Sequence, residues 1–149
     1  MRAVLQRVDR ATVVVGGEEI ARIGRGILAL VGISRDDTHA DLEWMAHKIL
    51  ELRFFDDPEG KLNLSLQDIG GELLVVSQFT LYGDCRKGRR PSYSDAAPPA
   101  RAEELYRDFV ATVRKLHPRI QSGRFQAMMD VSLVNSGPVT LIVDSRKTF

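Results

Sequence analysis

The pattern of apolar and polar residues predicts a chain built mainly from β-strands. Two β-rich stretches lie between residues 3 and 15 and end at Gly16-Gly17, a pair that supplies the positive backbone angles of a tight hairpin. Residues 19–23 are the expected return strand. The compact apolar runs at 27–33 and 73–76 are typical of buried strands. The remaining β-type segments are expected at residues 53–55, 62–66, 129–134 and 139–143.

Two other segments show the spacing of amphipathic helices. The first begins near Thr38, where Asp41 completes a capping arrangement, and the second lies between Pro99 and Pro118. The apolar residues of the first are Leu42, Met45, Ala46 and Ile49, and those of the second are Ala102, Leu105, Tyr106, Phe109, Val113 and Leu116. Many short strands with two helices that do not alternate strictly predict an α+β fold with a largely antiparallel or mixed sheet.

Composition narrows the class of protein. At 149 residues, the chain is expected to form a single domain over residues 1–149. Its net charge of +1 gives no overall positive field, so any contact with RNA must come from a local patch. No apolar stretch approaches the ~20 residues of a membrane helix, and residues 1–8 do not have the pattern of a signal peptide. Cys85 is the single cysteine and has no internal disulfide partner, so we expect a cytoplasmic protein.

Most familiar catalytic signatures are absent from the sequence. His39, His47 and His117 do not have the spacing of metal ligands, and we expect them to be surface or partly buried residues with no metal bound. Cys85 lies in a basic loop, but no partner base for a nucleophilic thiol is evident. There is no Gly-x-Ser-x-Gly elbow, Walker loop or dinucleotide fingerprint. A hydrolase with this sequence would lack a conventional triad and a cofactor.

Two motifs carry polar groups at places where strands end. In SQFTL, residues 77–81, three polar side chains follow the most hydrophobic strand, either because the strand emerges into solvent or because a site lies there. In NSGPVT, residues 135–140, Gly137 and Pro138 stand between two β-rich runs. Because proline cannot donate to a sheet ladder, this pair is expected at a hairpin, an edge or an exposed tip. It is either an ordinary turn or a place where two backbone carbonyls are presented to a ligand.

Taken together, these motifs resemble the signatures of the D-aminoacyl-tRNA deacylases, the D-tyrosyl-tRNA deacylase family. The resemblance spans the chain, because MRAVLQRV at residues 1–8, GELLVV at 71–76 and GRF at 123–125 match in the same order and spacing. It implies the deacylase-family fold and a homodimer whose active site lies at the subunit interface. It also implies hydrolysis of the ester between a D-amino acid and the 3′ end of a tRNA, without a cofactor.

The resemblance also implies a role for Gly137 and Pro138. In the family the Gly-Pro bond is cis, and both carbonyls face into the pocket of the partner subunit, where they exclude an L side chain. Because glycine has no side chain to exclude, we expect glycyl-tRNA, such as tRNA-Ala mischarged with glycine, to be cleaved as well.

The residues of SQFTL are the expected catalytic group. The Thr80 hydroxyl is either a nucleophile, or the backbone N–H groups of Thr80 and Phe79 bind the oxyanion while the substrate 2′-OH and a water assist. We favour the second alternative, because no His or Lys near Thr80 in sequence is an evident base. Ser77 and Gln78 are expected to brace this loop by hydrogen bonds.

The other expected site residues support the gate or the tRNA. Arg7 fixes the Gly-Pro carbonyls or a neighbouring backbone group, unless it is a surface charge on an edge strand. Phe125 is expected to stack on the terminal adenine and Met129 to line its pocket, although both residue types also suit a core. Gln126 and Met128 stand where the family usually has a small residue and an Asp. A basic segment is expected to meet tRNA phosphates, unless it is only a solvated loop: Arg86, Lys87, Arg89 and Arg90.

Two other functions remain open at the level of sequence. One is a related deacylase with a different chirality preference and a trans Gly-Pro bond. The other is a module that binds tRNA acceptor ends, or single-stranded nucleic acid, without hydrolysis. Phe79 and the NSGPVT motif favour the D-specific enzyme.

Overall fold

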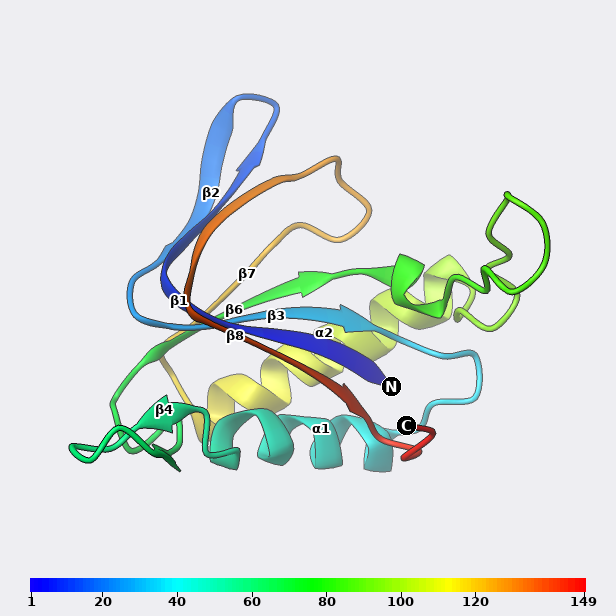
Figure 1. Ribbon diagram of the computed structural model, residues 1–149. Helices are drawn as coiled ribbons and strands as arrows, with labels where there is room; N and C mark the ends of the chain where they lie inside the picture. Colours follow the sequence, from blue (N-terminus) through cyan, green and yellow to red (C-terminus); the bar gives the residue numbers. More distant parts are fainter.

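The computed structural model describes residues 1–149 as a curled sheet with two helices against one of its faces (Figure 1). In chain order the elements are β1 (Arg2–Val15), β2 (Glu18–Ile23), β3 (Gly26–Gly32), α1 (His39–Glu51), β4 (Phe55–Asp56), β5 (Leu62–Leu64), β6 (Glu72–Ser77), the 3₁₀ helix η1 (Phe79–Tyr82), α2 (Pro99–Leu116), β7 (Ile120–Ser122) and β8 (Asp130–Asp144). The predicted α+β class with two main helices is confirmed.

Strand β1 organises the sheet. Its first half, from Arg2 to Val8, pairs with β3, and its second half, from Ala11 to Val15, pairs with β2. The two stretches predicted from sequence are therefore one strand that changes partner. Gly16 and Gly17 have φ angles of +57° and +82°, as the predicted hairpin requires.

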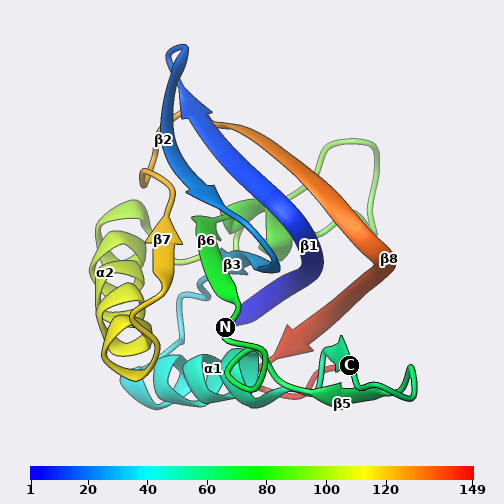
Figure 2. The same cartoon turned by 90° about the vertical axis from the view of Figure 1, so that its left-hand side faces the viewer.

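The sheet is mixed and closes partly on itself. Its order is β2-β1-β3-β6-β7, with β8 along the other side of β1, and the pairs β3–β6 and β6–β7 are parallel while the others are antiparallel. Figure 2 shows β1, β2 and β8 curving away from the helices, so that the far face of the sheet becomes concave.

Both faces of the central strand β6 are covered, which explains its unbroken apolar run. Leu73 and Val75 pack in the main core between the sheet and the two helices. Leu74 and Val76 pack in a second, smaller core on the concave face, where Met129 of the segment before β8 and Leu133 of β8 contact it. A strand buried on both faces does not alternate, because neither side meets water.

The helices follow their predicted apolar faces, with two corrections. The N–H of Thr38 donates to Asp41 Oδ2 at 2.9 Å, which confirms the predicted start of α1. In α2, Leu116 is 39% exposed rather than buried. The chain leaves the helix at this point, and His117 turns inward, with its Nε2 2.9 Å from the carbonyl of Gly71. His117 is therefore buried, not at the surface as one alternative had it.

Strand β8 differs most from the sequence-based picture. The two runs around Gly137-Pro138 do not form separate strands but one strand, Asp130–Asp144, which pairs only with β1. Gln6 of β1 pairs with Thr140 and Val8 pairs with Asn135, so the register shifts between them. The Gly-Pro pair lies within this irregular part of the ladder. Of the three predicted locations the edge is therefore the correct one, since an edge strand tolerates a residue without an N–H.

Candidate active site

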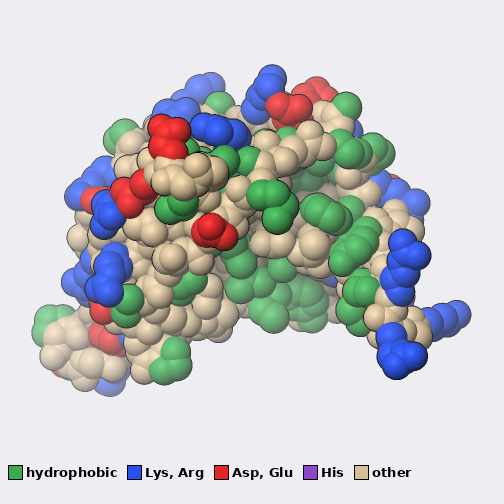
Figure 3. Space-filling view, turned by 90° about the horizontal axis from the view of Figure 1, so that it is seen from above, with side chains coloured by type: hydrophobic (Ala, Val, Ile, Leu, Met, Phe, Trp, Pro, Cys, Tyr) green, Lys and Arg blue, Asp and Glu red, His purple; other side chains and the backbone are tan.

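A cavity of about 860 Å³ lies at the carboxyl end of β6. Hydrophobic side chains line most of it, and Figure 3 shows such side chains gathered in a hollow beside the projecting loop whose tip carries Lys and Arg. One wall comes from the end of β6 and from η1, a second from the segment that leads into α2, and a third from residues 125–131. The lining includes Val76, Ser77, Gln78, Phe79, Tyr93, Ala97, Pro98, Phe125, Gln126, Ala127, Met128 and Met129.

Backbone donors without partners follow β6, where Ser77, Gln78 and Phe79 line the cavity. The first N–H groups of a helix have no acceptor within it. In η1, which begins at Phe79, Leu81 N–H donates to the Gln78 carbonyl. The N–H groups of Phe79 and Thr80 form no hydrogen bond within the chain. They are the donors that the sequence analysis expected to bind an oxyanion.

Gln78 braces this turn at two points. Its N–H donates to the Val31 carbonyl at 2.7 Å, and its Nε2 donates to the Thr80 hydroxyl. The Thr80 side chain therefore faces Gln78 and does not line the cavity. Ser77 lines the cavity, but its hydroxyl makes no hydrogen bond within the chain, so the expected bracing comes from Gln78 alone.

Phe125 and Met129 form the wall opposite η1. Phe125 is half-buried, lines the cavity and packs against Tyr106 with ring centroids 5.8 Å apart, so it belongs to the cavity and to the edge of the main core. Burial raises the pKa of Tyr106, and its protonated hydroxyl donates to the Val75 carbonyl at 3.1 Å. Gln126 has a positive φ of +59°, and the Met128 side chain is 92% exposed at the rim of the cavity.

Gly137 and Pro138 are joined by a cis peptide bond. Gly137 has a φ of +125°, and a Cβ added there would lie 2.7 Å from Arg7 Nη2 and 2.8 Å from Val139 Cγ2. Any other residue at this position would be strained, because of both the backbone conformation and the neighbouring side chains.

Arg7, on the central strand β1, binds the part of β8 that contains the Gly-Pro pair. Its side chain is only 12% exposed, Nε donates to the Ser136 carbonyl at 2.9 Å, and Nη1 donates to Asp56 Oδ2 at 3.1 Å. Arg7 is thus not a surface charge on an edge strand. It fixes the backbone group next to Gly137, which was one of the two arrangements expected.

The gate, defined as the Gly137-Pro138 peptide and its two carbonyls, does not line the cavity of its own chain. SQFTL and NSGPVT are therefore not brought together within one copy.

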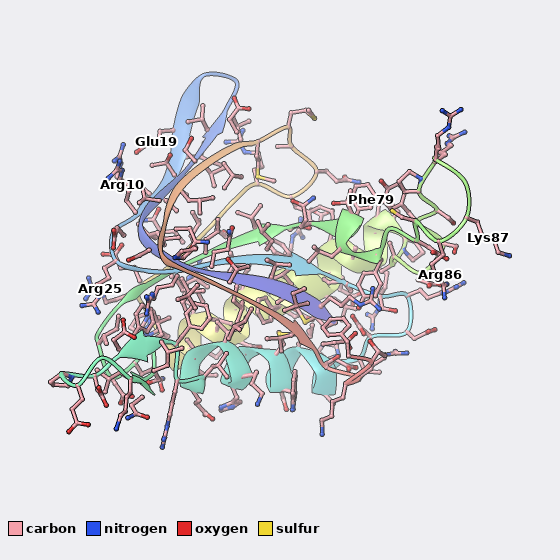
Figure 4. The ribbon with its side chains drawn as sticks, in the orientation of Figure 1. Arg10, Glu19, Arg25, Phe79, Arg86 and Lys87 are labelled. Atoms are coloured by element: carbon pink, nitrogen blue, oxygen red, sulfur yellow. The ribbon has the colours of Figure 1, made fainter.

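The basic segment, residues 86–90, forms the tip of a loop closed by the paired backbones of Asp84 and Ser92. Arg86 donates to both carboxylate oxygens of Asp84, at 2.8 and 2.7 Å, and these bonds hold the pKa of Asp84 well below its usual range. Lys87, Arg89 and Arg90 are exposed and form no ion pair. Figure 4 shows Arg86 and Lys87 projecting from the same end of the molecule as Phe79.

The remaining candidates for chemistry lie elsewhere. His39 contacts Asp108 and His47 contacts Glu51, each at 2.9 Å on the exposed surface of the helices. No three His, Cys, Asp or Glu side chains come together as metal ligands would, and Cys85 is exposed in the basic loop. Neither helix has the length and apolarity needed to cross a bilayer.

Tyr93 lines the cavity but was not among the residues singled out from sequence. Its ring meets that of Phe79 edge to face, with centroids 5.1 Å apart. The available signal was an aromatic residue shortly after four cations, a combination typical of nucleic-acid contacts.

The fold and the cavity define an α+β protein whose site lies at the end of a central strand and offers backbone donors in place of a side-chain triad. Residues 4–144 match the family model described as D-Tyr-tRNA(Tyr) deacylase. The D-aminoacyl-tRNA deacylase of Desulfitobacterium hafniense is 58% identical over 149 residues and that of Thermosipho africanus is 56% identical, each with 100% of both chains covered.

Solved structures agree with this result. One titled c-Myc DNA Unwinding Element Binding Protein has a TM-score of 0.92 and 47% identity, covering 97% of this chain and 98% of that one. A structure titled as a probable eukaryotic D-amino acid tRNA deacylase shares the fold, with a TM-score of 0.82 and 21% identity, covering 95% and 97% of the two chains. The chain belongs to the D-Tyr-tRNA(Tyr) deacylase family and is a hydrolase, which confirms the resemblance seen in the sequence.

Proposed function

We propose that this chain removes D-amino acids from tRNA by hydrolysing the ester at the tRNA 3′ end, and that a second copy of the chain supplies its selectivity. Two features support the proposal most directly. The N–H groups of Phe79 and Thr80 are unpaired, and Phe79 lines a largely apolar cavity. No Asp, Glu, His, Lys, Arg or Cys side chain lines that cavity.

The proposed mechanism needs little from side chains. A water adds to the ester carbonyl carbon, and the N–H groups of Phe79 and Thr80 donate to the oxyanion that forms. The bond from this carbon to the ribose oxygen then breaks, and the oxygen takes up a proton, with the neighbouring 2′-OH assisting. The products are a free D-amino acid and a tRNA with a free 3′ end. The hydrogen bond from Gln78 to the Thr80 hydroxyl supports this role over a nucleophilic one, since no base contacts that hydroxyl.

The terminal adenosine fits the wall opposite η1. Phe125 offers an aromatic ring and Met129 an apolar side chain, both half-buried in the lining of the cavity. Adenine bound there by stacking would place the ester at the Phe79 end. Gln126 and Met128 take the places of the small residue and the Asp usual in the family, so Gln126 offers an amide and Met128 an apolar contact at this rim.

The gate acts from a second copy. Gly137 and Pro138 lie outside the cavity of their own chain, and Arg7 of β1 donates to the carbonyl of the neighbouring Ser136. A homodimer that places each gate over the other chain's cavity puts two backbone carbonyls beside Cα of the substrate. An L side chain directed at them overlaps sterically and leaves their oxygens without hydrogen-bond partners, whereas a D side chain points away.

The matched D- and L-tyrosyl esters of one tRNA test this function. We expect loss of the D ester and survival of the L ester, measured as the aminoacylated fraction over time. Loss of the L ester would instead identify a deacylase of different chirality, and binding without loss of either ester would identify a module for acceptor ends.

Glycyl-tRNA-Ala tests the exclusion mechanism separately. We expect it to be cleaved, because glycine has no side chain to meet the carbonyls. A protein that cleaves D-alanyl-tRNA but spares the glycyl ester would contradict selection by steric exclusion alone.

A further inference from the structure

The cavity extends beyond Phe125 and Met129, the wall at which the terminal adenosine is proposed to bind. Beyond Phe79 its rim is formed by Tyr93, whose side chain is 40% exposed, in the segment that connects the basic loop to α2. Phe79 is 55% exposed, so neither ring of this pair is buried in the core. Exposed aromatic rings that meet edge to face at the mouth of a cavity offer flat apolar surface to a ligand.

The position of Tyr93 along the chain connects this surface to positive charge. The paired backbones of Asp84 and Ser92 close the basic loop immediately before Tyr93, so that the ring lies at the base of the loop and the cations lie at its tip. Asp84 neutralises Arg86, which leaves Lys87, Arg89 and Arg90 as the unpaired cations. A stacking surface followed by free cations is the arrangement by which proteins hold a single nucleic-acid strand.

The ring of Tyr93 is also well supported. It packs beside Gly83, where an added Cβ would lie 3.1 Å from Tyr93 Cε1, and its backbone carbonyl accepts a hydrogen bond from Ala96 N–H at 3.1 Å. A ring held in this way loses little freedom when a base stacks on its open side.

We propose that Tyr93 binds the nucleotide that precedes the terminal adenosine, by stacking on its base, and directs the strand toward Lys87, Arg89 and Arg90. This subsite rests on the proposed function, since it extends the path of the same tRNA end. It separates recognition of the strand, at Tyr93, from recognition of the esterified adenosine, at Phe125 and Met129.

The test compares two esters that differ only in the strand. One is D-tyrosyl-tRNA and the other is D-tyrosyl adenosine, which lacks every nucleotide before the terminal one. We expect Tyr93→Leu to lower kcat/KM for the tRNA by about 10- to 100-fold, the effect of losing one stacked base. For the adenosine ester we expect a loss at least about 10-fold smaller than for the tRNA. The matched control Tyr93→Phe keeps the ring and is expected to keep the selectivity between the two esters.

Binding of the unacylated trinucleotide CpCpA provides a readout that is independent of turnover. We expect fluorescence anisotropy to show weaker binding of CpCpA to Tyr93→Leu than to the unchanged protein or to Tyr93→Phe. Equal losses on both esters would overturn the proposal and show that Tyr93 only supports Phe79. CpCpA binding that is unaffected in Tyr93→Leu would overturn it too. Failure of the unchanged protein to cleave either ester would count against the proposed function, while CpCpA binding would still decide the role of Tyr93.

Discussion

At the scale of residues, Phe79 offers two separate groups for binding a substrate, its exposed ring and its unpaired backbone N–H. The ring is exposed at the mouth of the cavity, whereas the N–H points at no acceptor in the chain. A substitution that removes only one of these groups separates their contributions.

Phe79→Pro removes the donor, and Phe79→Ala removes the ring but keeps the donor. Proline is tolerated at the first position of a helical turn, so η1 is expected to form in both variants. We expect kcat of Phe79→Pro on D-tyrosyl-tRNA to be about 100- to 1000-fold lower than that of Phe79→Ala, the usual effect of losing one oxyanion donor.

Thr80→Ala extends this comparison to the side chain. It is expected to retain most of the activity, because the proposed role of Thr80 uses its backbone. Complete loss of activity in a folded Thr80→Ala protein would instead favour the hydroxyl as nucleophile.

Gly137 combines a backbone conformation that favours glycine with the proposed role in selectivity. Gly137→Ala places a methyl group 2.7 Å from Arg7 Nη2 at a φ of +125°. We expect this variant to be destabilised by about 1–3 kcal/mol and to cleave L-tyrosyl-tRNA faster, because the gate must shift. Urea unfolding and the ratio of D to L hydrolysis measure the two effects.

Gly24→Ala is the matched control, since no atom lies within 4 Å of its added Cβ and its φ is not positive. It is expected to stay within about 0.5 kcal/mol of the unchanged protein. A Gly137→Ala protein as stable and as selective as this control would argue against a rigid gate.

At the scale of elements, the basic loop exposes two cations, Arg89 and Arg90, that form no ion pair. We expect the double reversal Arg89→Glu, Arg90→Glu to weaken tRNA binding mainly at low salt, and to flatten the dependence of log Kd on log salt concentration. Filter binding over a series of salt concentrations measures this slope.

The control reverses Arg10 and Arg25 instead, which gives the same change of net charge at the opposite end of the molecule (Figure 4). This control is expected to leave most of the slope intact. Unchanged tRNA binding at low salt in the Arg89, Arg90 variant would remove the loop from the proposed tRNA path.

The end of β8 is tied to η1 through Asp144 and Arg2. Arg2 Nε donates to Asp144 Oδ2 at 3.1 Å, and Arg2 Nη1 donates to the Leu81 carbonyl at 3.3 Å. Burial works against ionisation of Asp144, but hydrogen bonds from Thr148, the Arg146 N–H and Arg2 outweigh it and lower its pKa. Arg2 therefore links η1 to the end of β8.

A lowered pKa means that Asp144 stabilises the fold above its unfolded pKa of about 3.9, and that this contribution is lost as the pH falls through the lower folded value. We therefore expect Asp144→Asn to lower the free energy of unfolding by about 1–3 kcal/mol at neutral pH. The deficit is expected to shrink as the pH falls below about 4. Urea unfolding at several pH values checks this, and a deficit independent of pH would contradict it.

At the scale of the whole molecule, the proposed function needs two copies of the chain, because Gly137 and Pro138 do not line the cavity of their own copy. Strand β8 is a free edge of the sheet, with Ile142 63% and Leu141 39% exposed (Figure 2). Apolar side chains on an open edge strand are suited to burial against another chain. We expect sedimentation to give the mass of a dimer.

Mixed dimers test whether the site is shared. Phe79→Pro chains have an intact gate but a weakened site, whereas Gly137→Ala chains have an intact site but an altered gate. Refolding Gly137→Ala with excess Phe79→Pro is expected to lower hydrolysis of the L ester while hydrolysis of the D ester remains, because the intact gate then covers the intact site. L hydrolysis that persists in an unchanged ratio to D hydrolysis would mean that each chain gates its own cavity.

Local patterns in the sequence determined much of this architecture. The spacing of Leu42, Met45 and Ile49 and the Thr38–Asp41 cap place α1, and Gly16-Gly17 place the first hairpin. Short elements such as β7 and η1 were not predicted, because a few residues carry no readable period. Leu116 was assigned to the core because helical spacing takes no account of where the neighbouring elements end.

The sequence by itself also determined the family, because whole motifs at given spacings can be recognised without knowing which residues they contact. Only the tertiary structure decided that NSGPVT lies within one edge strand, that Arg7 reaches Ser136 from the middle of the sheet, and that Tyr93 meets Phe79. The physical reason is that these contacts join residues far apart in the chain. Their distances depend on strand register and on the curl of the sheet, which no local pattern specifies.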